Sequence, residues 1–157
     1  MTILNMTSTR VYIVFYSNRP MNFRALAELS GVGPTLTQIK GESNEHNSFE
    51  YRLPVSHGKI VQRQYNKLMR AFKNSKQLGE YCKAHGIKVY VQVVVYGITD
   101  TYSFPILHMD KKFISFLADL NNAEVDFDMY TEPWDKEGDD YKEPAIVLPS
   151  GESLYKI

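Results

Sequence analysis

The chain has 157 residues, 43% of them hydrophobic and 13% aromatic, with 18 basic and 18 acidic side chains that cancel to a formal net charge of zero. This composition predicts one folded domain and excludes wholesale disorder, and the zero charge argues against a generally basic nucleic-acid binder. One cysteine excludes an intramolecular disulfide and a Cys-cluster zinc site, and no apolar run is long enough to span a membrane.

Periodicity of polar and apolar residues predicts strands and helices along most of the chain. The strands at 10–16 and 87–96 are apolar on both faces, which is typical of central positions in a sheet. The longest helical pattern breaks near Asn74, which would divide it into two helices. In chain order the predicted elements are strand 10–16, helix 23–30, strands 35–40 and 49–55, helix 59–85, strands 87–96 and 104–108, helix 113–120 and strand 124–130.

Helix ends carry capping residues. Asn22 and Asp110 are predicted N-caps, because a short side-chain oxygen can accept a backbone N–H of the first turn. Gly31 and Gly86 are predicted C-terminal caps, where glycine adopts the left-handed conformation without strain.

The element order β-α-β-β-α-β-β-α-β predicts an α+β fold. We expect a mostly antiparallel sheet with helices packed on one face. Residues 10–40 and 89–130 resemble each other loosely, which suggests a weak pseudo-repeat of two halves.

Several segments together carry a family resemblance. They are Phe23–Leu29 with Gly33-Pro34-Thr35 and Lys40-Gly41, the long helix after Leu53-Pro54, and Phe104–Leu107 through Phe113–Leu120 to Asp126–Tyr130. Over about residues 10–130 the chain resembles domain-of-unknown-function family 4279, short bacterial and phage-borne proteins. The resemblance implies an α+β fold and no established activity. The chain differs from the family pattern by lacking a Trp after Thr35 and by its acidic end.

Charge is distributed unevenly along the chain. Residues 1–118 hold 15 basic and 7 acidic side chains, whereas residues 119–143 hold 2 basic and 10 acidic ones. Zero net charge therefore conceals two opposed regions. We expect residues 1–130 to form a single α+β domain, and residues 131–157 an acidic linker with a terminal hairpin.

The acidic region contains the first set of candidate residues. Same-face residues of a strand lie about 6.5–7 Å apart, too far to share one ion without a neighbouring strand. A solvated face, a partner-binding surface and a metal or catalytic site therefore remain open, and Trp134 would either pack on the domain or anchor an interface. The candidate partner-binding residues are Glu124, Asp126, Asp128, Trp134, Asp135, Asp139 and Asp140.

A stripe of basic residues forms a second candidate surface. Its spacing follows one helix face, opposite the apolar stripe. Such a stripe can contact phosphates, be merely solvated, or receive the acidic tail. The residues are Lys59, Arg63, Lys67, Arg70, Lys73 and Lys76.

No catalytic motif is present in the sequence. The four histidines lack metal-ligand spacing, so we expect no metal and no cofactor. Cys82 is interpreted as a buried hydrophobe, although His85 lies three residues on. A ligand site assembled in three dimensions would use His57, Tyr12 and Tyr96.

These observations favour a non-enzymatic binding protein. It would occlude a surface of another macromolecule, such as a toxin or defence effector with a basic surface, as an inhibitor of the immunity or phage anti-defence type. One alternative is a ligand-binding or enzymatic domain, and a second is a nucleic-acid-binding module that uses the basic stripe. The absence of a secretory signal leads us to expect a cytoplasmic protein without membrane contact.

Overall fold

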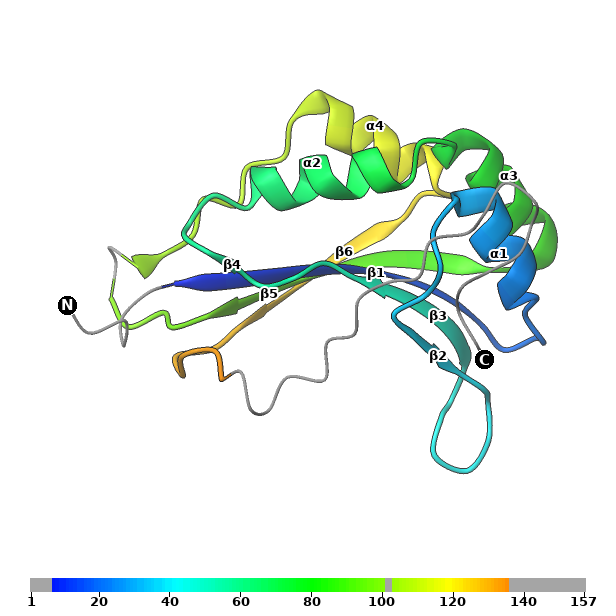
Figure 1. Cartoon of the computed structure of the whole chain (residues 1–157), viewed down its shortest axis with the longest axis horizontal. Coiled ribbons are helices and arrows are strands. Elements are labelled where there is room, and N and C mark those ends of the chain that lie inside the picture. Colours follow the sequence, from blue (N-terminus) through cyan, green and yellow to red (C-terminus); the bar gives the residue numbers. More distant parts are fainter. Residues whose placement is uncertain (1–6, 101–102, 136–157) are drawn as a thin grey trace.

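The sheet is built around one central strand, β1 (Ser8–Ser17), in a computed structural model that describes residues 7–100 and 103–135. The other strands are β2 (Leu36–Gln38), β3 (Asn47–Arg52), β4 (Ser56–His57), β5 (Lys88–Tyr96) and β6 (Glu124–Met129). Their order is β2-β3-β1-β5-β6, with β4 beside the start of β1 (Figure 1). All pairs are antiparallel except β5 with β6, which confirms the predicted α+β fold with a mostly antiparallel sheet.

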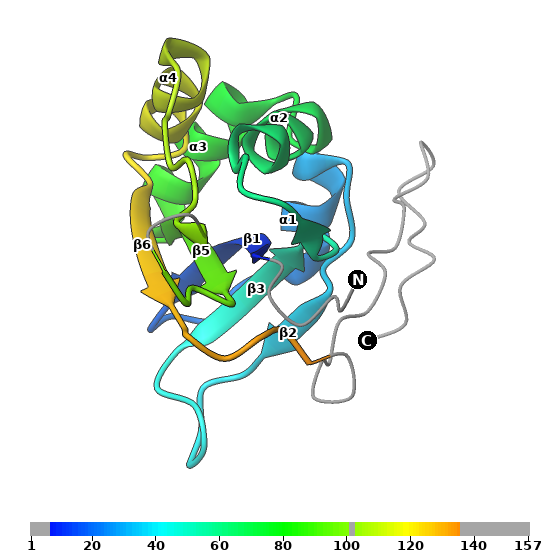
Figure 2. The same cartoon turned by 90° about the vertical axis from the view of Figure 1, so that its left-hand side faces the viewer.

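The helices of the described residues lie together on one side of the sheet (Figures 1 and 2). They are α1 (Phe23–Ser30), α2 (Gln62–Ala71), α3 (Ser75–His85) and α4 (Lys111–Asp119). The side chains of Asn22 and Asp110 accept backbone N–H groups of α1 and α4, at 3.0 and 2.9 Å, as predicted. Gly31 ends α1 with a φ of 76°, the left-handed conformation expected of a C-terminal glycine. Among the described residues, no helix is long and apolar enough to cross a membrane.

The core lies between the sheet and the helices. Because side chains alternate along a strand, every second residue of β1 and β5 points toward the helices and the others point away. Tyr65 of α2 stacks on Phe113 of α4 with ring centroids 4.1 Å apart, and Phe15 meets the edge of Phe49 at 5.8 Å. The opposite face of the sheet has no helix over it among the described residues (Figure 1).

Three segments differ from the sequence-based expectation. The helical pattern predicted over 59–85 divides near Asn74 as expected, but it begins only at Gln62. Its first residues instead pair with the chain at Ile106, whose N–H donates to the Lys59 carbonyl at 2.8 Å. Residues 104–108, predicted as a strand, make only one isolated bridge, between Ile106 and Ile60. The short strand β4 is an addition that no local pattern indicates.

The two halves of the expected pseudo-repeat pair differently in the sheet. In the first half β3 separates β2 from β1, whereas in the second half β6 pairs directly with β5. After β6 the chain returns to the sheet, and the Glu132 carbonyl accepts the Gly97 N–H at 2.8 Å. Residues 131–135, predicted as linker, therefore pack on the domain. The rest of the predicted linker and its terminal hairpin lie outside the described residues.

Candidate binding face of the sheet

The face of the sheet that points away from the helices is called here the open face. Alternation places Tyr12 on this face while its neighbours Val11 and Ile13 are fully buried in the core. Two open depressions cover the face, with volumes of about 420 and 460 Å³. They are called the first and the second depression below.

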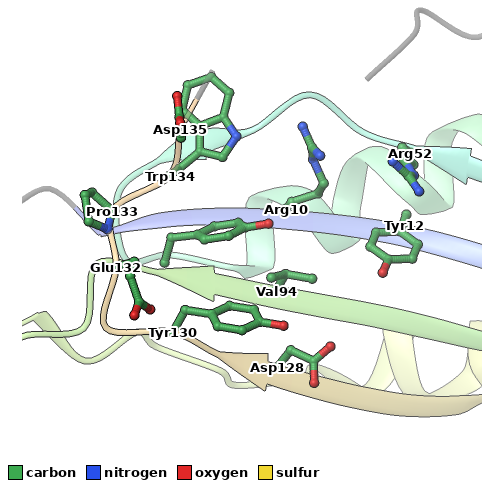
Figure 3. Close-up of a pocket in the computed structure, with 11 residues that line it drawn as sticks. Arg10, Tyr12, Arg52, Val94, Asp128, Tyr130, Glu132, Pro133, Trp134 and Asp135 are labelled. Carbon is green, nitrogen blue, oxygen red and sulfur yellow. The ribbon is translucent and has the colours of Figure 1, made fainter. Parts of the chain in front are cut away.

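The first depression extends across four strands (Figure 3). Strands β1, β3, β5 and β6 supply its floor, and residues 132–135 close one end. Arg10 lies in this floor with only 6% of its surface exposed. The lining residues are Arg10, Tyr12, Arg52, Val94, Tyr96, Asp128, Tyr130, Glu132, Pro133, Trp134 and Asp135.

Arg52 forms a partly buried ion pair beside the first depression. Its Nε lies 2.6 Å from Oε2 of Glu50, and the two side chains are only 15% and 13% exposed. The guanidinium carbon also lies 5.3 Å from the ring centroid of Tyr12. A cation held by a carboxylate and an aromatic ring has little freedom, so this end of the floor is fixed in place.

Two tyrosines of the open face hold their protons more tightly than usual. Burial raises the pKa of Tyr12 above its ordinary value, and the Glu50 carboxylate raises it further, partly offset by Arg52. Burial, followed by the charges of Glu50 and Asp126, raises the pKa of Tyr90. Both phenols therefore remain neutral at physiological pH, where they can donate hydrogen bonds but do not act as bases.

The second depression lies beside the first, toward the loop before β3. The ring of Tyr16 contacts Tyr90 at 5.6 Å and His46 at 5.3 Å between centroids. The Nδ1 atom of His46 is 2.6 Å from Oδ1 of Asn18, which fixes the imidazole at the rim. The lining residues are Val14, Tyr16, Gln38, Ser43, Asn44, Glu45, His46, Ser48, Glu50, Tyr90, Glu124 and Asp126.

The open face and the helices carry opposite charge. The two depressions are lined by seven carboxylates and two arginines, a formal charge of −5. The four described helices hold eight Lys or Arg and three Asp or Glu, a formal charge of +5. The charge segregation seen along the sequence thus becomes a segregation between two sides of the molecule.

The predicted acidic residues of β6 all belong to the open face. Glu124 and Asp126 line the second depression and Asp128 the first, and all three are exposed. Oδ2 of Asp128 accepts a 2.7 Å hydrogen bond from Nε2 of Gln92. Within residues 7–100 and 103–135, no group of three or more His, Cys, Asp or Glu could hold a metal ion. The predicted residues Asp139 and Asp140 lie outside the described residues.

Trp134 and two of the three candidate ligand residues line the first depression. Tyr12 and Tyr96 line it, and Tyr96 stacks with Tyr130 at 5.6 Å and an interplanar angle of 20°. His57 does not line it, but its ring contacts Trp134 at 5.6 Å, and its Nδ1 lies 2.9 Å from the Ser8 hydroxyl. His57 therefore supports the wall that Trp134 forms rather than facing a ligand.

The predicted basic surface lies on the helical side of the molecule. Arg63, Lys67 and Arg70 belong to α2, Lys76 belongs to α3, and Lys59 and Lys73 flank α2. All six side chains are exposed. The helices separate this surface from the acidic strand β6.

Several members of the open face were not identified from the sequence, and Arg10, Glu50 and Arg52 are the clearest cases. Strand alternation alone places Arg10 on the other side of β1 from Val11 and Ile13, so its position on the open face could have been predicted. By contrast, Arg52 stands beside Tyr12 only because of the register between β3 and β1. No local sequence pattern predicts that register.

Comparison with known proteins identifies the family of the chain. The model of a domain of unknown function, DUF4279, matches residues 7–132. The chain belongs to the DUF4279 family. No curated protein and no solved structure matches it. The DUF4279 region contains every described strand and helix and ends within the segment that closes the first depression.

Proposed function

We propose that this chain is a non-enzymatic binding protein whose open face covers a basic surface of a partner protein. The observation that carries the proposal is the charge of this face, seven carboxylates against two arginines on a sheet surface that no described helix covers. An inhibitor of the immunity or phage anti-defence type would work in this way, by occluding the partner's functional surface. The proposal places this binding in the cytoplasm, in keeping with the free thiol of Cys82.

The chemistry of the open face suits lysine and arginine side chains. Carboxylates accept charge-assisted hydrogen bonds from both, and aromatic faces attract cations. Tyr96, Tyr130 and Trp134 stand beside the carboxylates of the first depression, and such rigid aromatic residues are frequent interface anchors. The acidic field also accelerates encounter with a basic partner, an effect that salt weakens.

Two charge-reversed variants test this proposal. The first combines Glu124→Lys with Asp126→Lys on the open face, and the matched control combines Lys67→Glu with Arg70→Glu on α2. Each is used in affinity capture from a lysate of the source cell beside the unmodified chain, with recovered proteins quantified by mass spectrometry. We expect the open-face variant to lose basic partners that the control retains, while thermal melts of all three chains agree.

Two outcomes contradict the proposal. One is recovery of the same partners, in the same amounts, by the unmodified chain and the open-face variant. The other is selective loss of partners by the α2 variant, which would assign binding to the helical side. The open-face variant raises the formal charge by 4 and the α2 variant lowers it by 4. A further variant, Glu80→Lys with Asp119→Lys on the helical side, also raises the charge by 4 at exposed positions and therefore controls for net charge.

A second candidate function is binding of a small molecule in the first depression. Its volume of about 420 Å³ falls within the range of ligand sites, about 300–1,000 Å³. The buried Nε1 of Trp134 has no hydrogen-bond partner among the described residues, so a ligand oxygen could satisfy it. Trp134 is the only tryptophan, so its fluorescence reports occupancy. A saturable change that Tyr96→Ala abolishes and Tyr16→Ala retains would favour this function.

A further inference from the structure

Strand β6 ends the sheet with an unpaired edge. It is the last strand in the order, and among the described residues no strand pairs with its outer side (Figure 2). The opposite margin of the sheet is formed by β2, which has only three residues, against six in β6. The longer free edge is therefore the acidic one.

The register shows which backbone groups of β6 are available. The Tyr130 N–H donates to the Val95 carbonyl at 2.8 Å, and the Tyr130 carbonyl accepts from Ile98 at 3.1 Å. Backbone groups along a strand alternate in direction. The N–H and C=O groups of the even-numbered residues of β6 therefore point toward β5. The N–H and C=O groups of Val125, Phe127 and Met129 consequently point outward.

The side chains of β6 give this edge two distinct faces. Glu124, Asp126 and Asp128 project on the open face, where all three are exposed. Phe127 and Met129 project on the helix side and remain 39% and 40% exposed. A strand added at this edge would therefore meet carboxylates on one face and apolar groups on the other.

The charge of β6 decides which occupant suits the edge. A second copy would place its own three carboxylates opposite these three, and like charges directly across a strand pair are destabilising. The strand contains no proline, glycine or lysine, residues that commonly protect a free edge from pairing. The edge thus opposes self-association and favours a strand with basic side chains.

We propose that β6 binds an extended segment of the partner protein in which basic and apolar residues alternate, and that this segment adds a strand to the sheet. The backbone groups of Val125, Phe127 and Met129 would supply the hydrogen bonds, and the acidic and apolar faces of β6 would select the alternating sequence. This inference rests on the proposed binding function and names the segment that the protein takes.

A synthetic peptide tests the inference directly. The probe is a blocked peptide of about seven residues that alternates lysine and valine, long enough to pair along β6. Amide hydrogen exchange is followed by NMR in the full chain. We expect the amides of Val125, Phe127 and Met129 to become protected about tenfold or more, and those of Asp126 and Asp128 to change less. A peptide of the same composition with lysines and valines in separate blocks should protect none of the three.

A matched pair of variants isolates the backbone contribution. Phe127→Pro removes an N–H that points outward and donates no hydrogen bond to β5, whereas Phe127→Ala removes the same side chain and keeps the N–H. We expect the proline variant to bind the alternating peptide about tenfold more weakly than the alanine variant. If the proline variant fails to fold, the exchange measurement on the unmodified chain decides alone.

Three results would overturn the inference. In the first, the peptide leaves amide exchange at Val125, Phe127 and Met129 unchanged but shifts the NMR signals of Tyr12 and Tyr96. The peptide would then bind the open face and not the edge of β6. In the second, the alternating and block peptides bind equally, which would mean that the protein recognises only the charge of the peptide and not its alternating sequence. Protection of the three amides on raising the protein concentration, without peptide, would make a second copy the occupant. The proposed function fails separately, in the capture experiment with the charge-reversed variants.

Discussion

Adjacent residues of β1 belong to two faces of the sheet that differ in burial and in chemistry. Ile13 is fully buried beneath the helices, whereas Tyr12 faces the first depression beside Arg10 and Arg52. The covered face is apolar and tightly packed, and the open face is aromatic and acidic. Because alternation separates the two within each strand, the same strands carry the apolar core on one side of the sheet and charged and aromatic groups on the other.

Truncation of a buried ring tests the covered face, and we expect the largest effect there. Phe49→Ala should lower the free energy of unfolding by about 3–5 kcal/mol, because the ring is fully buried and its loss leaves a cavity. The matched open-face change, Tyr130→Ala, removes a ring that is 45% exposed and should cost less than about 1 kcal/mol. Urea unfolding of both variants measures the difference. Equal losses in the free energy of unfolding would contradict the distinction between a covered face that stabilises the fold and an open face that does not.

A glycine of α3 tests how closely the helical layer is packed. Glycine-to-alanine changes inside helices ordinarily stabilise by about 0.5–1 kcal/mol. A Cβ at Gly79, however, would overlap the backbone carbonyl of Asp119 at the end of α4. We therefore expect Gly79→Ala to destabilise by about 1–3 kcal/mol in thermal or urea unfolding. Gly41→Ala, where the nearest atom is 4.0 Å away, should stay within about 0.5 kcal/mol.

Alkaline pH tests the desolvation of the open face. An unfolded tyrosine ionises near pH 10, whereas burial holds the pKa of Tyr12 above that value. From about pH 10 up to the folded pKa the unfolded chain releases a proton that the folded chain retains, so stability declines as the pH rises. Tyr12→Phe removes this contribution, and its free energy of unfolding should decline less between about pH 9 and pH 11. An identical decline in both proteins would mean that Tyr12 is solvated.

Charge reversal on the helical side should have the smallest effect. Lys67 and Arg70 are exposed, so Lys67→Glu and Arg70→Glu should each change the free energy of unfolding by less than about 0.5 kcal/mol. Neither change should weaken binding of a basic peptide to the open face, as followed by titration. Binding of duplex DNA that falls steeply with salt and disappears in these variants would instead support the nucleic-acid alternative.

Local patterns were sufficient to predict most elements of the fold. The caps at Asn22 and Asp110 and the break near Asn74 depend on a few neighbouring residues, and the structure confirms all three. Strand alternation likewise puts Tyr12 on the other side of its strand from Val11 and Ile13, and it puts Glu124, Asp126 and Asp128 together on one side of the last strand. These features could be read from the sequence because neighbouring residues decide them.

Features that depend on distant pairing could not be predicted. The ion pair of Glu50 and Arg52 lies beside Tyr12 because of the register between β1 and β3, which are separated by a helix, a strand and a loop. Trp134 forms a wall of the first depression because the chain turns back after β6, and no periodicity describes that turn. The bridge of Ile106 to Ile60 similarly replaces a predicted strand with a single long-range contact.

The central position of β1 also governs how the chain can assemble during synthesis. β1 is synthesised before the other described strands, yet one of its edges pairs along its length with β5, from Ser8 opposite Tyr96 to Tyr16 opposite Lys88. This edge of β1 therefore stays unpaired until the chain has been made as far as β5, about 80 residues later. A nascent chain halted before Lys88 would present this edge of an apolar strand, still unpaired, to chaperones and proteases.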